Sequence, residues 1–220
     1  MTDSIEISFL LSAGDVADPY AELVETLSKS DGYQIPNDNE RKDHHSSVIR
    51  SADVANFICD LIGHDAGSDW SSLPSAPAIE LEVGSETFTV GDAPEQQLET
   101  VLEVVETIYS ALDDCIFGYG LDIEHIGSLV EGRELGKPMT DESLAENRIN
   151  EVSWLMLFGP ELVAEYGREW LLSAPAWKRE ELDDGAILLV ASPDPTDYEQ
   201  FSEDRDILRT YFDRRGNDSE

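Results

Sequence analysis

Acidic side chains outnumber basic ones more than threefold along this chain. Its 220 residues include 48 Asp and Glu against 14 Lys and Arg, which gives a formal net charge of −34. The excess is even, with 22 acidic residues before position 111 and 26 from there on. A disordered acidic tail would hold its charge in one block and would lack periodic apolar positions. The sequence therefore predicts a folded protein with a carboxylate-covered surface.

Such a surface repels itself in dilute buffer, where the Debye length is about 10 Å at 0.1 M salt, and is screened at molar salt, where that length is about 3 Å. Lysine is scarce, with four in the whole chain. The composition resembles that of haloarchaeal proteins, which implies a salt-rich cell interior. The apolar runs 154–158 and 186–191 are much shorter than a membrane span of about 18 residues. We therefore expect a cytoplasmic protein.

The charge distribution also excludes classes of partner. Residues 51–132 contain no Lys or Arg at all. A nucleic-acid binder needs a basic footprint, and an anionic membrane surface attracts the same kind of residue. The four arginines between positions 205 and 215 are diluted by acidic neighbours. We expect neither nucleic acid nor membrane among the partners.

Periodicity predicts the elements of the chain. Apolar residues at helical spacing predict helices over 15–30, 51–62, 94–112, 141–148, 160–172 and 203–213. Runs of apolar or alternating residues predict strands over 4–11 and 149–158, hairpins over 78–91 and 176–192, and strand, turn and strand over 115–126. Polar, irregular stretches over 33–50, 64–77 and 127–140 are expected to be loops.

This order of elements predicts an α+β fold, with a mostly antiparallel sheet flanked by helices. We expect one compact unit over 1–220, or two tightly joined halves, 1–112 and 113–220. The order strand, helix, hairpin, helix occurs once in each half, so the fold is consistent with a duplicated unit. The residues themselves do not repeat.

Motifs for catalysis are absent from the sequence. It contains no G-x-G-x-x-G, no P-loop, no G-x-S-x-G and no H-E-x-x-H, and we expect no cofactor. His44, His45 and His64 could join Asp and Glu in a metal-dependent hydrolase, which is the alternative to a non-catalytic function. A hydrated loop explains the two adjacent histidines more simply. Carboxylate pairs such as Glu80 and Glu82 carry little information in so acidic a chain.

The two cysteines, Cys59 and Cys115, have apolar neighbours and no motif spacing. A reactive thiolate needs a positive environment, which neither segment offers. We expect both to be buried free thiols.

Aromatic residues point to a binding surface in the C-terminal part. Three of the four tryptophans lie there, and Trp170 and Trp177 flank a Ser-Ala-Pro segment. Exposed tryptophan and arginine side chains are typical anchors of protein interfaces. The candidate contacts with a protein partner are Tyr119, Arg148, Trp170 and Trp177. The alternative for the two tryptophans is that they fill the junction between helix and hairpin.

The segment from Trp154 to Val190 also resembles part of a known group of proteins. A strand with Trp, then FGPELV, YG and a Pro-containing loop before DGAILLV is similar to the C-terminal part of immunity-type proteins of polymorphic toxin systems. CIFGYG at 115–120 is similar to a preceding aromatic-Gly strand. The resemblance implies an α+β protein that binds another protein and catalyses nothing. Homo-oligomerisation is also open on the sequence.

Overall fold

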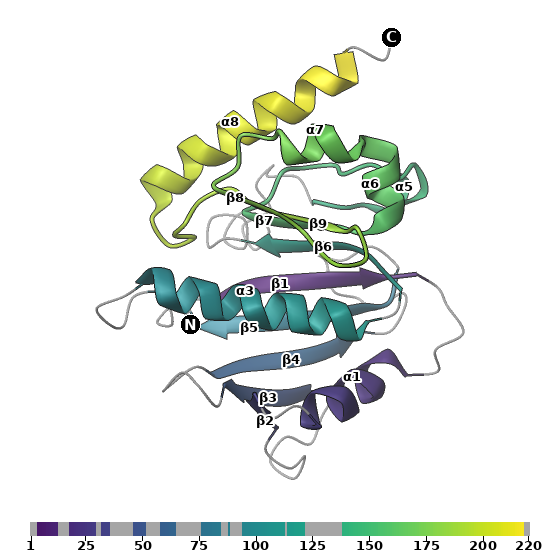
Figure 1. The fold of residues 1–220 in the computed structure, drawn as a ribbon, viewed down its shortest axis with the longest axis vertical. Helices are drawn as coiled ribbons and strands as arrows, with labels where there is room; N and C mark the ends of the chain where they lie inside the picture. Colours follow the sequence, from purple (N-terminus) through teal and green to yellow (C-terminus); the bar gives the residue numbers. More distant parts are fainter. Residues whose placement is uncertain are drawn as a thin grey trace.

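The computed structural model describes ten stretches of the chain: 4–12, 18–29, 32–35, 46–51, 58–64, 76–84, 88, 94–112, 114–121 and 138–217. These form an α+β structure built on one antiparallel sheet, which confirms the predicted fold class (Figure 1). Within the described residues, no helix is both long and apolar enough to cross a membrane.

Among the described residues, nine strands form the sheet in the order β2-β3-β4-β5-β1-β6-β7-β9-β8, and every neighbouring pair is antiparallel. Their bounds are β1 Ser4–Leu11, β2 Tyr33–Gln34, β3 Ser46–Ser51, β4 Ile58–His64, β5 Ala78–Gly84, β6 Cys115–Leu121, β7 Leu155–Phe158, β8 Lys178–Glu181 and β9 Ile187–Val190. The pairing of β1 with β6 joins strands from the two halves of the chain.

The helices cover both faces of this sheet. Their bounds are α1 Pro19–Ser28, α3 Pro94–Ala111, α5 Asp141–Ala145, α6 Pro160–Tyr166, α7 Arg168–Leu172 and α8 Tyr198–Asn217. Lys178 of β8 contacts Glu99 of α3, whereas Phe158 of β7 stacks on Phe212 of α8. The register places Lys178 and Phe158 on opposite faces. Hence α3 lies on one face and α8 on the other.

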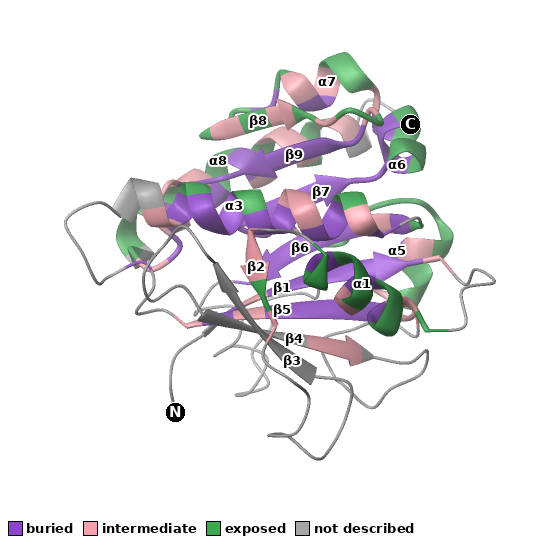
Figure 2. Ribbon diagram, turned by 60° about the horizontal axis from the view of Figure 1, so that its bottom comes forward, coloured by how far each residue is buried: buried purple, intermediate pink, exposed green. Residues whose placement is uncertain are grey.

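Burial follows from this arrangement (Figure 2). The central strands β1, β5, β6, β7 and β9 are buried along most of their length, and α1 and α3 expose only their outer sides. The apolar stripe of α3, from Leu98 to Leu112, is buried against the sheet as its helical spacing predicted. The buried free thiol of Cys115 is confirmed, while the side chain of Cys59 lies outside the described residues.

The predictions for residues 33–62 are wrong. The expected loop over 33–50 contains strand β2 and most of β3, and the expected helix over 51–62 is replaced by strand β4 over its described residues. Leu61 of β4 lies opposite Leu81 of β5 in register. Pairing with β3 and β5 satisfies the backbone of β4 on both sides, and this long-range pairing overrides the helical spacing of its apolar residues.

The predicted hairpin over 78–91 does not form. Strand β5 is flanked by β1 on one side and by β4 on the other, so neither edge is open to a strand at 87–91. Phe88 is helical and buried, and the rest of that second strand lies outside the described residues.

In the segment 115–126, predicted as strand, turn and strand, β6 runs without a break through Gly118 and Gly120 to Leu121. A Cβ atom at Gly120 would lie 2.9 Å from the ring of Trp154, and one at Gly118 would lie 3.2 Å from Leu157. These glycines allow neighbouring side chains to cross β6 closely. The second strand predicted up to residue 126 lies outside the described residues.

In the C-terminal half most predictions are confirmed. Thr140 caps α5 with a reciprocal contact to Ser143, and β8 and β9 form a hairpin around 183–185. The strand expected over 149–158 is limited to β7, and the closing helix begins at Tyr198, five residues earlier than predicted. Gly167, with φ of 91°, divides the helix predicted over 160–172 into α6 and α7.

Both halves arrange their strands in the same way. β1 lies beside β5 with β4 outside it, and β7 lies beside β9 with β8 outside it. In each half a helix follows the first of these strands. In the proposed repeat, the hairpin of the first half corresponds to β4 and β5 and not to residues 78–91. The duplication itself remains a prediction.

Candidate functional site

A groove of about 440 Å³ lies where α6 and α8 meet the segment after α5. It is lined by Arg148, Ile149, Asn150, Glu151, Val152, Glu165, Tyr166, Arg209, Phe212, Asp213 and Arg215. Arg148 is the only member that the sequence singled out. Residues 149–152 follow it directly, and the remaining members lie on α6 and α8, which pack together there.

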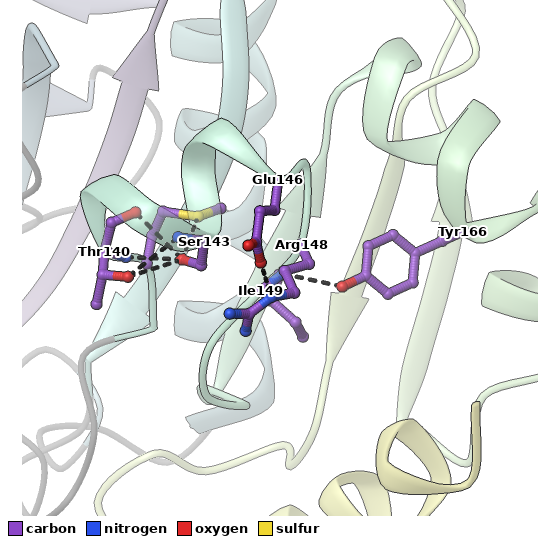
Figure 3. A network of polar contacts seen from close by, with 7 residues as sticks. Thr140, Ser143, Glu146, Arg148, Ile149 and Tyr166 are labelled. Carbon is purple, nitrogen blue, oxygen red and sulfur yellow. Dashed lines mark hydrogen bonds and ion pairs between the residues drawn. The ribbon is translucent and has the colours of Figure 1, made fainter. Parts of the chain in front are cut away.

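One wall of the groove is held by the turn after α5. Asn147 has a positive φ of 50°, which reverses the chain at the end of this helix. The N–H of Ile149 then donates to the hydroxyl oxygen of Tyr166 over 2.9 Å, so the segment 148–152 is tied to α6 (Figure 3). Burial raises the pKa of Tyr166, and the phenol stays neutral at physiological pH.

Arg148 lies on the rim, with about half of its side chain exposed. Its Nε donates to Glu146 over 2.6 Å, as Figure 3 shows. An exposed ion pair of this kind contributes little to stability and is readily exchanged for another partner. The guanidinium of Arg148 is thus available to a docking protein at low cost.

The opposite wall is formed by α8. Arg209 donates to Glu151 over 2.8 Å and to Asp206 over 2.9 Å. The guanidinium of Arg215 lies 4.4 Å from the ring centre of Tyr166 and donates to the carbonyl of Glu165. Three arginines and three carboxylates therefore line the groove, so its charge is balanced in a chain whose formal net charge is −34.

Trp170 belongs to an aromatic cluster beside the groove. Its ring stacks on Tyr211 at 4.6 Å and meets Phe212 edge-on at 4.9 Å. The hydroxyl of Tyr211 donates to the carbonyl of Trp170 over 2.7 Å. Trp170 is half-buried and packs α7 against α8, so it fills a junction between two helices and not the junction between helix and hairpin that the sequence left open. The guanidinium of Arg215 lies over its ring, 5.5 Å from the ring centre.

Trp177 and Tyr119 have opposite environments. Trp177 is 41% exposed, one of two large apolar side chains in the described part of the chain that face solvent. Tyr119 is fully buried in β6, where burial raises the pKa of its phenol. The prediction of Tyr119 as a contact residue is therefore wrong, because its side chain is not accessible from the surface.

A second polar group, missed by sequence reasoning, lies on the sheet. Glu6 of β1 is directly opposite Glu82 of β5, and Ser8 is opposite the buried Glu80. Burial and the neighbouring charges of Glu80 and Glu82 raise the pKa of Glu6 to about 7. Alternation along both strands could have placed these carboxylates on one face, but the high frequency of Glu concealed the signal.

The described residues give no support to the alternative of a metal-dependent hydrolase that uses histidines. His44 and His45 lie outside them, and His64 ends β4. Among the side chains that the structure describes, no three His, Cys, Asp or Glu residues converge on a point that could hold a metal ion.

Comparison with models of protein families, with curated proteins and with solved structures found no match for this chain.

Proposed function

We propose that this chain is a non-catalytic, protein-binding protein of a salt-rich cytoplasm, with an immunity-like role. Its binding surface is the groove around Arg148 together with the half-buried Trp170 and the exposed Trp177. The observation that carries the proposal is the local charge balance, because the groove gathers three arginines on a chain of net charge −34.

The residue types at this surface support protein binding. Arginine and tryptophan are enriched at interfaces, where they combine apolar contact area with hydrogen-bond donors. Arg148 and Arg209 line the groove together with the aromatic residue Phe212. A partner that inserts an aromatic or acidic side chain would find both kinds of contact there.

Affinity capture with matched variants tests the proposal. The tagged chain, the variant Arg148→Glu and the control variant Lys29→Glu are each used to capture partners from a haloarchaeal extract in molar KCl. Lys29 also forms an exposed ion pair, with Glu25 at 2.7 Å, but is the C-cap residue that follows α1. We expect one stoichiometric partner with the parent chain and with Lys29→Glu, and its loss with Arg148→Glu. Equal recovery with all three proteins would contradict the proposed surface.

The immunity-like role has a separate test. The captured partner, expressed alone in a susceptible host, should arrest growth, and co-expression of this chain should restore it. A partner that is harmless when expressed alone would remove the immunity-like role and leave protein binding intact.

A further inference from the structure

Arg148 has unused hydrogen-bond donors at the rim of the groove. A guanidinium carries N–H groups on three nitrogens, and in Arg148 only Nε is engaged, with Glu146 at 2.6 Å. Within the described residues, Nη1 and Nη2 have no hydrogen-bond partner (Figure 3). About half of the side chain is exposed, so the donors on these two nitrogens are accessible to another molecule.

The other two arginines of the groove are held by contacts within the chain. Arg209 donates from both Nε and Nη1 to carboxylates of neighbouring residues. Arg215 lies over the ring of Tyr166 and donates to the carbonyl of Glu165. Among the arginines that line the groove, Arg148 is therefore the one whose donors are best placed to bind a partner.

The carboxylates that line the groove have partners of their own. Glu151 accepts hydrogen bonds from Arg209 and from the N–H of Val152. The carboxylate of Glu165 lies 3.9 Å from a guanidinium nitrogen of α8, and Asp213 also interacts within the chain. The groove thus offers spare donors at Arg148, and these donors suit an acceptor that carries negative charge.

We infer that Arg148 binds one Asp or Glu side chain of the protein partner, through the fork formed by Nη1 and Nη2. The inference rests on the proposed function, which supplies the partner. A carboxylate accepts two parallel N–H bonds from one guanidinium, and such charge-assisted pairs are among the strong hydrogen bonds of proteins. The bond from Nε to Glu146 orients the guanidinium in advance, so less conformational freedom is lost on binding.

The surroundings of Arg148 favour a single carboxylate over a more highly charged group. The charges of Glu146 and Glu142 act on Arg148, and they would repel a phosphate or a run of acidic residues. Ile149 and Phe212 line the adjoining groove and offer apolar surface to the methylene groups of an Asp or Glu side chain. An isolated acidic residue in an apolar stretch of the partner fits both conditions.

Molar salt leaves this contact in place. Screening acts mainly on solvent-exposed charges separated by more than the Debye length, about 3 Å at 1 M, whereas a partly buried pair is screened much less. Two directed hydrogen bonds hold the carboxylate once the partner covers the rim of the groove. Their geometry, and not the long-range field of a chain with net charge −34, selects the occupant.

A replacement series at position 148 tests the inference, with the partner captured by the parent chain as the probe. In molar KCl, Arg148→Leu keeps an apolar stem without donors and should lower the affinity about 10- to 100-fold. Arg148→Lys keeps the charge without the fork and should lie between this variant and the parent, and Arg148→Glu should bind most weakly. The control is Arg214→Leu, because Arg214 is an exposed arginine of α8 that does not line the groove. It should bind like the parent.

A charge exchange then identifies the occupant. Each Asp and Glu of the partner is replaced by Lys in turn, and one replacement should abolish binding to the parent chain and restore binding to Arg148→Glu. Restored binding also shows that Arg148→Glu is folded. Parent-like affinity of Arg148→Leu, or the absence of any restoring exchange, would overturn the inference and leave the proposed protein binding intact. If the parent chain captures no partner, the proposed function is wrong, and this inference is wrong with it.

Discussion

The guanidinium of Arg215 lies over the ring of Tyr166, 4.4 Å from its centre, and joins the last turns of α8 to α6. The hydroxyl of the same tyrosine accepts the N–H of Ile149. Tyr166 thus connects both walls of the groove. Cation–π and hydrogen-bonding contacts to one ring couple the shape of the groove to the stability of the fold.

Removal of the Tyr166 hydroxyl should weaken one wall of the groove. In Tyr166→Phe the N–H of Ile149 loses its acceptor, and we expect a loss of about 1 kcal/mol in the free energy of unfolding. Urea unfolding at molar salt measures it. Hydrogen exchange should also become faster at residues 149–152. Unchanged exchange in this segment would show that the bond does not hold the wall.

Trp170 and Trp177 should respond very differently to truncation. Trp170→Ala removes a ring that packs on Tyr211 and Phe212, and we expect a loss of about 2–3 kcal/mol. Trp177→Ala removes a side chain that is 41% exposed and should change the free energy of unfolding by less than about 0.5 kcal/mol. Thermal unfolding of both variants at molar salt provides the comparison. Equal losses would contradict the structural role given to Trp170.

Glu6 should make the protein less stable as pH rises. Its pKa in the folded state is about 7, raised from 4.5, so the folded state holds this proton more tightly than the unfolded state does. Stability contributed by the protonated carboxyl is present below pH 4.5 and is lost as pH rises through about 7. Because Glu6 is only partly buried, we expect Glu6→Gln to gain about 1–2 kcal/mol at pH 8 and nothing at pH 4.5.

Urea unfolding of parent and variant at both pH values checks this prediction. Glu25→Gln is the control, because the hydrogen bond from Lys29 lowers the pKa of Glu25. Its stabilising contribution is present above the unfolded pKa and is lost as pH falls, so this variant should be slightly less stable at pH 8. If Glu6→Gln had the same free energy of unfolding as the parent at pH 8, ionisation of Glu6 would not destabilise the folded state, and the prediction would be wrong.

Salt should stabilise the folded chain as a whole. With a net charge of −34, raising KCl from 0.1 M to 2 M shortens the Debye length from about 10 Å to under 3 Å and screens the repulsion among carboxylates. The melting temperature should rise steadily over this range, as circular dichroism can follow. Full, cooperative melting at the same temperature in nearly ion-free water would remove the argument for a halophilic protein.

Local patterns predicted the elements that tertiary packing leaves unchanged. The stripe from Leu98 to Leu112 repeats at helical spacing for several turns, and α3 follows it. In β4, by contrast, Ile58 and Leu61 have a spacing that suits a helix, and only pairing with β3 and β5 makes the segment a strand. Such pairing joins residues that are far apart in the sequence, where periodicity gives no information.

The groove could be predicted only in part for the same reason. Arg148 was recognisable as an arginine beside an aromatic segment. Arg209 reaches Glu151 across 58 positions, and Arg215 reaches Glu165 across 50. Phe212 stacks on Phe158 and so packs α8 against the sheet. A local sequence pattern cannot reveal a contact between residues so far apart in the chain. The prediction of Tyr119 as a contact residue was wrong because β6 lies in the middle of the sheet, where Tyr119 is buried.

Photo-crosslinking from position 165 tests the central claim most directly. A benzophenone amino acid replaces Glu165, an exposed residue that lines the groove, in one chain and Lys29 in another, and each chain is irradiated in haloarchaeal cells. We predict one discrete crosslinked partner from position 165 and none from position 29. Crosslinks of equal pattern from both positions, or none from position 165 while the folded chain is abundant, would contradict a binding surface at the groove.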